Sequence, residues 1–196
     1  MRIFGVILAG GAARRMGTDK ALVPLGGQPL IAWVAERLSP QVEALAISAN
    51  GDPARFSALG LPVLPDAEAQ GPLAGILAAL KWAAPLGATA VVSCPCDSPF
   101  LPPDLVPRLC LAAEPGLVSF AVSGQDQHPT HALWPVGLSA ALESFLASGA
   151  VPRVREFARQ HGAERASFPS GSFANANSPE DLARLEVLLR GARDAL

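Results

Sequence analysis

Two glycines followed by three cationic side chains form the stretch of this sequence that is richest in chemistry. Gly10 and Gly11 close the first apolar run of the chain, and the cations Arg14, Arg15 and Lys20 come shortly afterwards. Glycine adopts backbone angles that a Cβ atom forbids, so amide N–H groups can approach an anion closely while the cations oppose its charge. The stretch therefore predicts a loop that binds the triphosphate of a nucleotide; the alternative is a Gly-rich turn with a solvated basic face.

The spacing of these residues excludes the two best-known phosphate-binding loops. A Walker A loop needs a Gly-Lys-Ser/Thr triplet, whereas Gly17 is followed here by Thr-Asp-Lys. A Rossmann fingerprint needs G-x-G-x-x-G, which the positions of Gly10, Gly11 and Gly17 do not give. The loop belongs to neither class.

A carboxylate after a later apolar run supplies a second part of the same chemistry. Asp97 comes shortly after the run 91–94, just past the expected end of a buried strand. Mg²⁺ prefers one or two carboxylates together with phosphate oxygens and water, so Asp97 could hold a divalent ion against a triphosphate. The alternative is a turn that Asp97 opens and Pro99 continues.

The elements that must position these residues alternate along the first half of the chain. Short β-branched or apolar runs predict strands at 3–8, 44–48, 63–64 and 90–93. Helix-length segments follow them at 30–38, 53–59, 73–83 and 103–113, with Pro29, Pro72 and Pro103 near the first turns. This alternation is typical of βα units, and it predicts a three-layer α/β/α sandwich around a Rossmann-like, mostly parallel sheet.

The second half of the chain is less regular. Strands are expected at 117–122 and 132–134, and helices at 136–146 and 153–160. Ser178 and Pro179 have the residue types of an N-cap and a first helical position, so a last helix is expected from there to about Leu189.

Polar side chains follow most of the expected parallel strands. Ligands of an open parallel sheet gather beyond the carboxyl ends of its strands, where Gly10, Asn50, Asp66 and Asp97 are placed. The amide of Asn50 could pair with a base edge or a ribose hydroxyl, and Asp66 could accept from an exocyclic amine or a ring N–H. The same residue types also occur in plain turns.

The composition favours a compact domain without a polymer partner. The 196 residues suit one domain spanning 1–196, and half of them are hydrophobic while only 16% are charged. A net charge of −2 gives no global field for nucleic acid or an anionic membrane. No apolar run is long enough to span a membrane or form a signal segment, so we expect a cytoplasmic protein whose three cysteines are reduced, structural thiols.

Residues 8–20 match the pattern L-A-G-G-x-x-R-R-M-G-x-D-K. This pattern is similar to the signature of the molybdenum cofactor guanylyltransferases, within the nucleotidyltransferases of nucleoside-diphosphate-sugar-transferase-like fold. Further matching segments are D-x(4)-G-P-L-A-G at 66–75, C-D-S-P-F at 96–100, His128-Pro129, and F-x-N-x-N-S-P-E-D-L at 173–182. The resemblance therefore extends over residues 7–182.

The resemblance implies a reaction as well as a fold. Mg²⁺ on Asp97, together with Arg15 and Lys20 as catalytic cations, would hold GTP while the terminal phosphate of molybdopterin attacks its α-phosphorus and pyrophosphate leaves. The product would be molybdopterin guanine dinucleotide. Asn175 and Asn177 would lie on the pterin side, so the N-terminal half would bind the nucleotide and the C-terminal half the molybdopterin. The nucleotide-binding residues would be Leu8, Ala9, Gly10, Gly11, Lys20, Asn50, Asp66, Gly75 and Asp97.

The expected partners are GTP, molybdopterin or its molybdenum-loaded form, and, transiently, cofactor-insertion machinery or molybdoenzymes, with the enzyme itself a monomer.

Rival activities are a molybdopterin cytidylyltransferase, whose relatives tend to have L-A-A-G at 8–11, and a sugar-phosphate nucleotidyltransferase. A non-catalytic cofactor chaperone is a third possibility, but it would not need Asp97 and Lys20 together.

Several of these residues also have a purely structural interpretation. Gly75 suits tight helix–strand packing, and Asn175 and Asn177 suit the approach to a helix cap. His128 and His131 lack a third ligand at metal-binding spacing, so we expect solvent-facing or hydrogen-bonded histidines.

Overall fold

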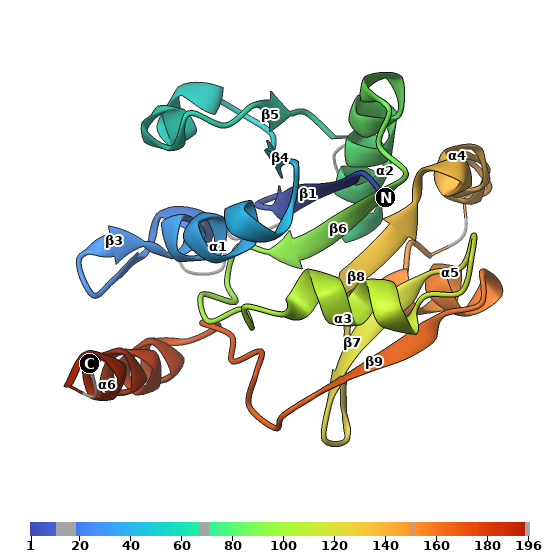
Figure 1. The fold of residues 1–196 in the computed structure, drawn as a ribbon. Helices are drawn as coiled ribbons and strands as arrows, with labels where there is room; N and C mark the ends of the chain where they lie inside the picture. The colour runs from blue at the N-terminus through green and yellow to red at the C-terminus, as the bar shows by residue number, and fades with distance from the viewer. Residues whose placement is uncertain (11–18, 67–70, 150, 195–196) are drawn as a thin grey trace.

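The computed structural model describes residues 1–10, 19–66, 71–149 and 151–194. Within them a sheet of seven strands has the order β5-β4-β1-β6-β8-β7-β9 (Figure 1). Four neighbouring strands run parallel to one another, namely β1 (Ile3–Leu8), β4 (Ala44–Ser48), β5 (Val63–Leu64) and β6 (Ala90–Pro95). β8 (Asp126–Pro135) is antiparallel to β6 and to β7 (Ser119–Ser123), and β9 (Glu164–Phe168) is parallel to β7. The predicted mostly parallel sheet is confirmed.

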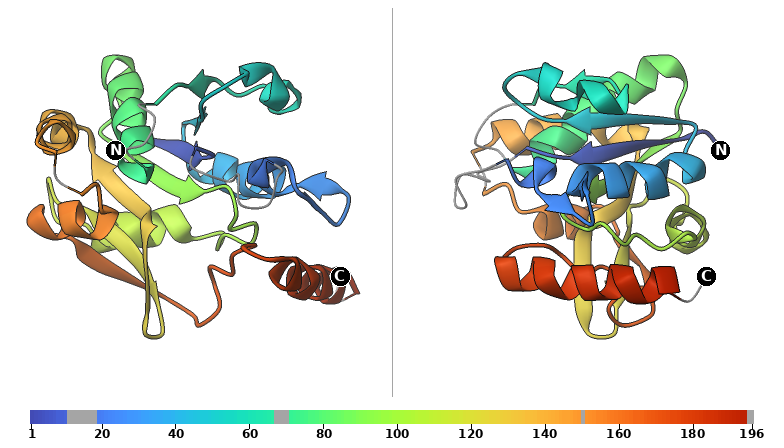
Figure 2. Two further views of the ribbon diagram at one scale, coloured as in Figure 1. Left: turned by 180° about the vertical axis from the view of Figure 1, so that it is seen from behind. Right: turned by 90° about the vertical axis from the view of Figure 1, so that its left-hand side faces the viewer.

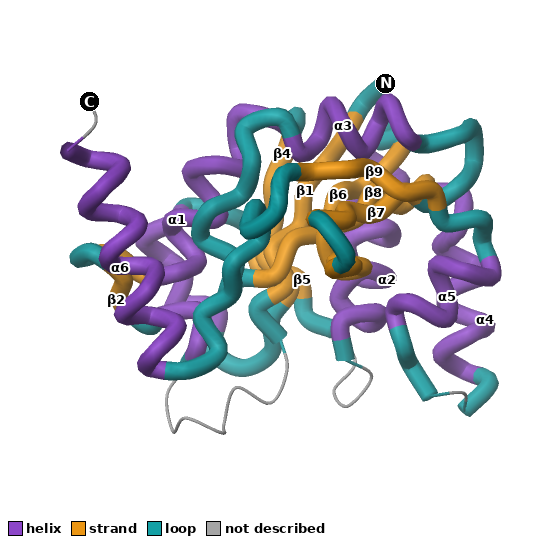
Figure 3. Tube along the Cα trace, turned by 90° about the horizontal axis from the view of Figure 1, so that it is seen from below, coloured by secondary structure: helices purple, strands orange, loops and turns teal. Residues whose placement is uncertain are grey.

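Helices cover both faces of this sheet. On one face lie α1 (Leu30–Leu38) and α3 (Leu105–Ala112). On the other lie α2 (Pro72–Ala83), α4 (Ser139–Ala147) and α5 (Val154–Gln160). Figure 3 shows the strands between α3 on one side and α2, α4 and α5 on the other. The three-layer α/β/α architecture is therefore confirmed.

The apolar run of β1 explains why it is the central strand. Every residue from Ile3 to Leu8 is buried. Ile3 and Ile7 face the layer of α1 and α3, while Phe4 and Leu8 face the layer of α2. Alternate side chains of a strand point to opposite faces, so a strand covered on both sides must be apolar at nearly every position. Each such side chain contributes about 1.5–3 kcal/mol when it is fully buried.

A third hydrophobic cluster joins the C-terminal helix to an early hairpin. The helix α6 (Pro179–Asp194) packs on β2 (Pro24–Leu25), which forms a hairpin with β3 (Gln28–Pro29). Leu185 and Leu189 of α6 share a buried cluster with Leu25 of β2 and Trp33 of α1. Figure 2 shows α6 standing apart from the strands of the large sheet. This cluster connects the chain just after Lys20 with the chain just after Asn177, so it ties together two segments that meet at the site described below.

Some expected elements differ from those in the structure. The segment Pro53–Leu59 is a 3₁₀ helix instead of an α-helix. Only Phe56 is buried in it, and the segment is limited by Asp52 as its N-cap and by Gly60, in the left-handed conformation, at its C-terminal end, so it stays a short, tight helix. The region 136–146 begins with a 3₁₀ turn, Val136–Leu138, and α4 begins only at Ser139. α3 begins at Leu105, beyond Pro103, and α6 continues past Leu189 to Asp194.

The pattern of apolar residues missed three strands, β2, β3 and β9, and predicted β8 too short. β8 begins at Asp126, well before the expected 132–134, because its polar first half pairs with β7 in a hairpin. β9 was not expected, since only Ala166 and Phe168 are buried in it. The strands β2 and β3 have two residues each, too few for any periodicity. Across the described residues, every helix is too short or too polar to cross a membrane.

Candidate active site

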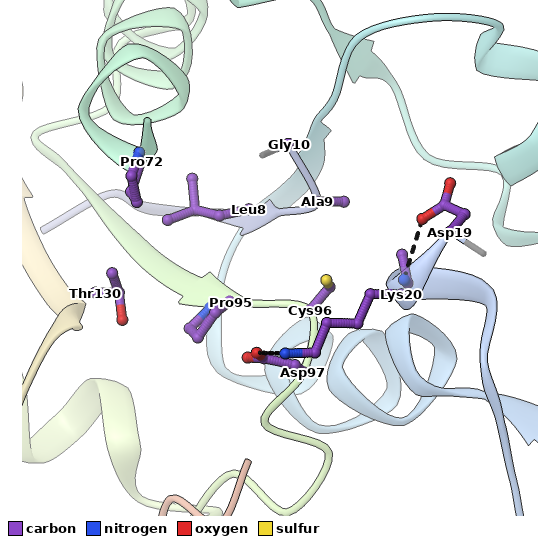
Figure 4. A pocket seen from close by; sticks show the side chains of 11 residues that line it. Leu8, Ala9, Gly10, Asp19, Lys20, Pro72, Pro95, Cys96, Asp97 and Thr130 are labelled. Carbon is purple, nitrogen blue, oxygen red and sulfur yellow. Dashed lines mark hydrogen bonds and ion pairs between the residues drawn. The ribbon is translucent and has the colours of Figure 1, made fainter. Parts of the chain in front are cut away.

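A cleft of about 250 Å³ lies at the carboxyl ends of β1 and β6. Its walls come from the end of β1 with Ala9 and Gly10, from Lys20 at the start of the 3₁₀ turn Lys20–Leu22, from Pro72 of α2, and from Asp97 after β6. Figure 4 shows Lys20 and Asp97 pointing toward one another within this cleft. The structure thus brings together the glycine and the cation that follow the first predicted strand and the carboxylate that follows the fourth.

Lys20 and Asp97 form the charged centre of the cleft. The Nζ atom of Lys20 lies 2.5 Å from Oδ2 of Asp97 and 2.5 Å from Oδ1 of Asn177. The side chains of Lys20 and Asp97 are only 20% and 16% exposed. Burial of this extent removes most of the water that would otherwise screen the two charges, so their interaction is stronger than that of a surface pair.

The second carboxylate oxygen of Asp97 is suited to a metal ion. Oδ1 of Asp97 is buried and has no hydrogen-bond partner among the described residues. A buried polar atom without a partner is costly, and a cation would satisfy it. Among the residues that the structure describes, no group of three His, Cys, Asp or Glu side chains could hold a metal. A single carboxylate fits an ion that takes its other ligands from phosphates and water, as Mg²⁺ does.

The turn that carries Lys20 is fixed by Asp19. Oδ1 of Asp19 accepts from the backbone N–H of Ala21 at 3.1 Å, which caps the 3₁₀ turn. Oδ2 of Asp19 forms an ion pair with Nε of Arg55 at 2.9 Å. Asp19 also lines the cleft, and its two contacts hold the turn that carries Lys20.

The segment before α6 is pinned onto the loop after β6. Oγ of Ser98 donates to Oδ1 of Asn175 at 2.5 Å, and the N–H of Ala176 donates to the carbonyl of Asp97 at 2.9 Å. With the bond from Lys20 to Asn177, both predicted asparagines lie beside the charged centre. No local sequence pattern predicts these contacts, because their partners are far apart in the chain.

The predicted helix cap after Asn177 is present. The N–H of Asp181 donates to Oγ of Ser178 at 3.1 Å, and the N–H of Ser178 donates to Oδ2 of Asp181 at 3.0 Å. The same Oδ2 accepts from the N–H of Asn177 at 3.0 Å. This reciprocal capping box fixes the start of α6 and, with it, the backbone of Asn177.

A second polar cluster lies at the ends of β4 and β5, beside Gly10. Oγ of Ser48 donates to Oδ2 of Asp66 at 2.7 Å, and Nδ2 of Asn50 donates to Oδ1 of Asp66 at 2.5 Å. The N–H of Asp66 donates back to Oδ1 of Asn50 at 3.1 Å. Sequence reasoning missed Ser48; the available indication was a polar residue closing an apolar strand.

Two glycines make room for this cluster. A Cβ atom at Gly10 would lie 2.9 Å from Oδ2 of Asp66, and one at Gly75 would lie 2.4 Å from Oγ of Ser48 and 2.9 Å from Cδ2 of Leu8. Gly75, on α2, is therefore packed against the ends of β4 and β1. The assignments of Gly75 and Gly11 to the nucleotide and of Arg15 to catalysis stay predictions. Gly11, Arg14 and Arg15 lie outside the described residues.

The two histidines differ from each other. Nε2 of His128 lies 2.8 Å from Oγ of Ser123, as expected for a satisfied side chain. The expectation is wrong for His131, which is buried between His128 and Phe173, with ring nitrogens that have no hydrogen-bond partner among the described residues. Burial lowers the pKa of His131 to about 3, so the ring is neutral. The neighbouring strands and Phe173, distant in sequence, bury it.

The cysteines are unbonded thiols. Cys94 and Cys96 are buried, and Cys96 lines the cleft. Burial raises the pKa of the Cys96 thiol to about 12, so it stays protonated and is a poor nucleophile.

The fold and the cleft define the class of protein. A loop after the first strand and a carboxylate after a neighbouring strand meet at one edge of a mostly parallel sheet, as in α/β enzymes that bind nucleotides. A family model described as the MobA-like NTP transferase domain matches residues 5–165. The chain belongs to this family of nucleotidyltransferases, and the resemblance found in its sequence is confirmed.

Individual relatives agree with the family match. A Cereibacter sphaeroides protein named molybdenum cofactor guanylyltransferase is 60% identical over 192 residues, covering 97% of this chain and 98% of the relative. A solved structure from Archaeoglobus fulgidus, molybdopterin-guanine dinucleotide biosynthesis protein A, has a TM-score of 0.74 at 24% identity and covers 96% and 99% of the two chains. Rv0371c of Mycobacterium tuberculosis, solved in complex with manganese, has a TM-score of 0.69 at 17% identity and covers 95% and 99%. At these identities the two structures show the shared fold.

Proposed function

We propose that this enzyme transfers GMP from GTP to the terminal phosphate of molybdopterin, or of its molybdenum-loaded form. The observation that carries the proposal is the Lys20–Asp97 pair, held beside Gly10 in the cleft after β1. The name of the 60% identical relative supports guanylyl transfer and the two substrates. The product is molybdopterin guanine dinucleotide.

In the proposed reaction an oxygen of the molybdopterin phosphate forms a bond to the α-phosphorus of GTP. The bond from that phosphorus to the bridging oxygen breaks, and pyrophosphate leaves with the electron pair. Negative charge increases on the leaving pyrophosphate and on the α-phosphate oxygens. Lys20 and Arg15 stabilise this charge, and because Lys20 is already fixed by its neighbours, little reorganisation is needed.

We further propose that Asp97 holds a divalent ion, Mg²⁺, through the unpartnered oxygen Oδ1. When bound, the ion neutralises phosphate charge and orients the triphosphate. The manganese complex of a protein with this fold supports a divalent ion. Lys20 keeps Oδ2 occupied, which leaves Oδ1 as the oxygen available to the metal.

The cluster around Asp66 is assigned to the guanine base. Guanine presents a ring N–H next to an exocyclic amine, and a carboxylate accepts from both. Asn175, which accepts from Ser98, and Asn177, which accepts from Lys20, keep their assignment to the pterin side. Action as a cytoplasmic monomer and transient contact with insertion machinery or molybdoenzymes remain predictions.

The rival activities are less well supported. Leu8-Ala9-Gly10-Gly11 differs from the L-A-A-G of the cytidylyl relatives. A sugar-phosphate nucleotidyltransferase does not agree with the name of the relative. A chaperone that only stores the cofactor has no need of a partly buried Lys20–Asp97 pair.

Nucleotide binding with Mg²⁺ present tests the proposal. GTP should bind at least about tenfold more tightly than CTP, a difference of about 1.4 kcal/mol that one or two hydrogen bonds supply. ATP and UTP serve as further comparisons, and pyrophosphate release with molybdopterin tests the transfer itself. Equal affinities, or a preference for CTP, would contradict the proposal.

A further inference from the structure

The ends of β4 and β5 are in register, which places three polar side chains together. Ser48 pairs with Leu64, and the N–H of Ala49 donates to the carbonyl of Leu64 at 3.0 Å. Two residues further along, Asn50 therefore lies opposite Asp66. Ser48, the last residue of β4, and Asn50, two positions beyond it, project on the same side of the chain. The contact between these residues follows from the sheet itself.

The carboxylate of Asp66 is held at both oxygens. Ser48 donates to Oδ2 at 2.7 Å and Asn50 donates to Oδ1 at 2.5 Å, while the backbone N–H of Asp66 returns a bond to Asn50. A carboxylate has about four acceptor positions, so two remain for a ligand. The side chain is thus restricted to one orientation before any ligand binds.

The hydroxyl of Ser48 is enclosed. Ser48 is fully buried, and the α-carbon of Gly75 on α2 packs so closely that a Cβ atom there would lie 2.4 Å from Oγ. This packing limits the movement of the hydroxyl. On the other side of the cluster, Oδ2 of Asp66 adjoins Gly10, which lines the cleft.

We infer that Ser48 and Asn50 are positioning residues that set the base selectivity of the enzyme through Asp66. The inference rests on the proposed function, in which Asp66 accepts from guanine. Asn50 then acts through Asp66, because its carbonyl and one of its amide hydrogens are already engaged there.

The chemistry of the bases explains why orientation matters. Guanine offers two neighbouring donors to a carboxylate, whereas cytosine offers one exocyclic amine beside a ring nitrogen that is itself an acceptor. A fixed carboxylate with both oxygens toward this edge binds guanine and repels the cytosine ring nitrogen. A carboxylate that rotates freely loses part of this discrimination and must also be ordered when the ligand binds.

The variant Ser48→Ala, with Ser119→Ala as a matched control, tests the inference. Ser119 is also a fully buried strand serine, and its Oγ donates to the carbonyl of Leu109 at 2.7 Å, away from the cleft. For each protein kcat and KM are measured with GTP and CTP, and melting temperatures report the fold. In Ser48→Ala the ratio of kcat/KM for GTP over CTP should fall at least about threefold, through a higher KM for GTP with kcat nearly unchanged. Ser119→Ala should keep the ratio of the parent.

The outcomes separate this inference from the proposed function. A parent that prefers GTP and a Ser48→Ala protein with the same ratio would overturn the inference alone. A parent with no preference for GTP would overturn the proposed function and the inference with it. A merely structural role for Ser48 would lower the melting temperature and the activity with both nucleotides equally, which also overturns the inference. If Ser48→Ala does not fold, Asn50→Ala at the partly exposed strand end must show the same fall in the ratio.

Discussion

The Nζ atom of Lys20 lies 2.5 Å from Oδ2 of Asp97, although the two residues are 77 positions apart in the chain. Asn177, which lies just before α6, accepts from the same ammonium group. The turn after the Gly-rich loop, the loop after β6 and the approach to α6 therefore meet at one cation. Its place is fixed before a nucleotide arrives, which is the condition under which a charge lowers a reaction barrier most.

The first prediction concerns this cation. Lys20→Ala should lower kcat for guanylyl transfer by about 10²-fold or more, because the ammonium stabilises charge that develops on the phosphates. Lys81→Ala is the control: Lys81 pairs with Glu143 on the surface, with half of its side chain exposed. Pyrophosphate release gives the rates, and circular dichroism checks that both variants fold. A Lys20→Ala protein with the turnover of the parent would remove Lys20 from the mechanism.

The second prediction separates the two interpretations of Asp97. Asn keeps the shape of Asp and can still open a turn. If Asp97 is only a turn residue, the Asp97→Asn enzyme should therefore be almost normal. If Asp97 is a metal ligand, the Asp97→Asn enzyme should need at least about tenfold more Mg²⁺ than the parent for half-maximal transfer, since a hard dication favours the negative charge of the carboxylate. GTP should still bind through the loop at Gly10. Transfer is measured against Mg²⁺ concentration, with Asp104→Asn as a control at an exposed pair with Arg108.

Unchanged metal dependence in a folded Asp97→Asn protein would contradict the assignment. Melting temperatures of the parent and of both variants show whether lost activity reflects lost structure. Direct titration of Mg²⁺ into each protein gives a second readout that does not depend on transfer.

Much of the fold and the positions of the site residues along the strands were predictable. The strands β1, β4 and β6 are buried on both faces, so their apolar runs stand out, and a parallel sheet brings their carboxyl ends to one edge. Lys20 and Asp97 follow two of these ends. Their meeting is thus a consequence of topology that the sequence already indicated.

The contacts within the site were not predictable in the same way. Asn177 reaches Lys20 only because α6 docks on the early hairpin, and that hairpin consists of strands too short to have a pattern. Ser48 pairs with Leu64 in the register of β4 and β5, so Asp66, two residues beyond Leu64, projects on the same side as Ser48 and accepts from its hydroxyl. Such contacts depend on long-range packing, which periodicity within one segment does not report.

The third prediction concerns Gly75, for which packing and base contact were both open. A methyl group at this position would lie 2.4 Å from Oγ of Ser48 and 2.9 Å from Cδ2 of Leu8. Gly75→Ala should therefore destabilise the protein by about 1–3 kcal/mol, the usual cost of overpacking. Gly137→Ala is the control, because nothing lies within 4 Å of its added Cβ. Urea unfolding measures both; a Gly75→Ala protein of normal stability and weakened GTP binding would favour the base contact instead.

The last prediction concerns the dependence of stability on pH. Burial lowers the pKa of His131 to about 3 in the folded protein, whereas an unfolded histidine has a pKa near 6.5. Below pH 6.5 the unfolded chain takes up a proton at this residue that the folded protein does not, so stability falls as the pH is lowered from about 6.5 toward 3. The loss is about 1.4 kcal/mol per pH unit within that window, or about 2 kcal/mol between pH 6.5 and pH 5.

Replacing the ring with an apolar side chain should remove this dependence. His131 packs on Phe173, with ring centroids 4.6 Å apart, so His131→Leu keeps the site apolar. His128 also has a pKa lowered by burial, and its effect on the slope has the same sign in both proteins. Urea unfolding at pH 7 and pH 5 should therefore show a loss of stability in the parent that is about 2 kcal/mol larger than in His131→Leu. Equal losses in the two proteins would mean that His131 is protonated in the folded state at pH 5.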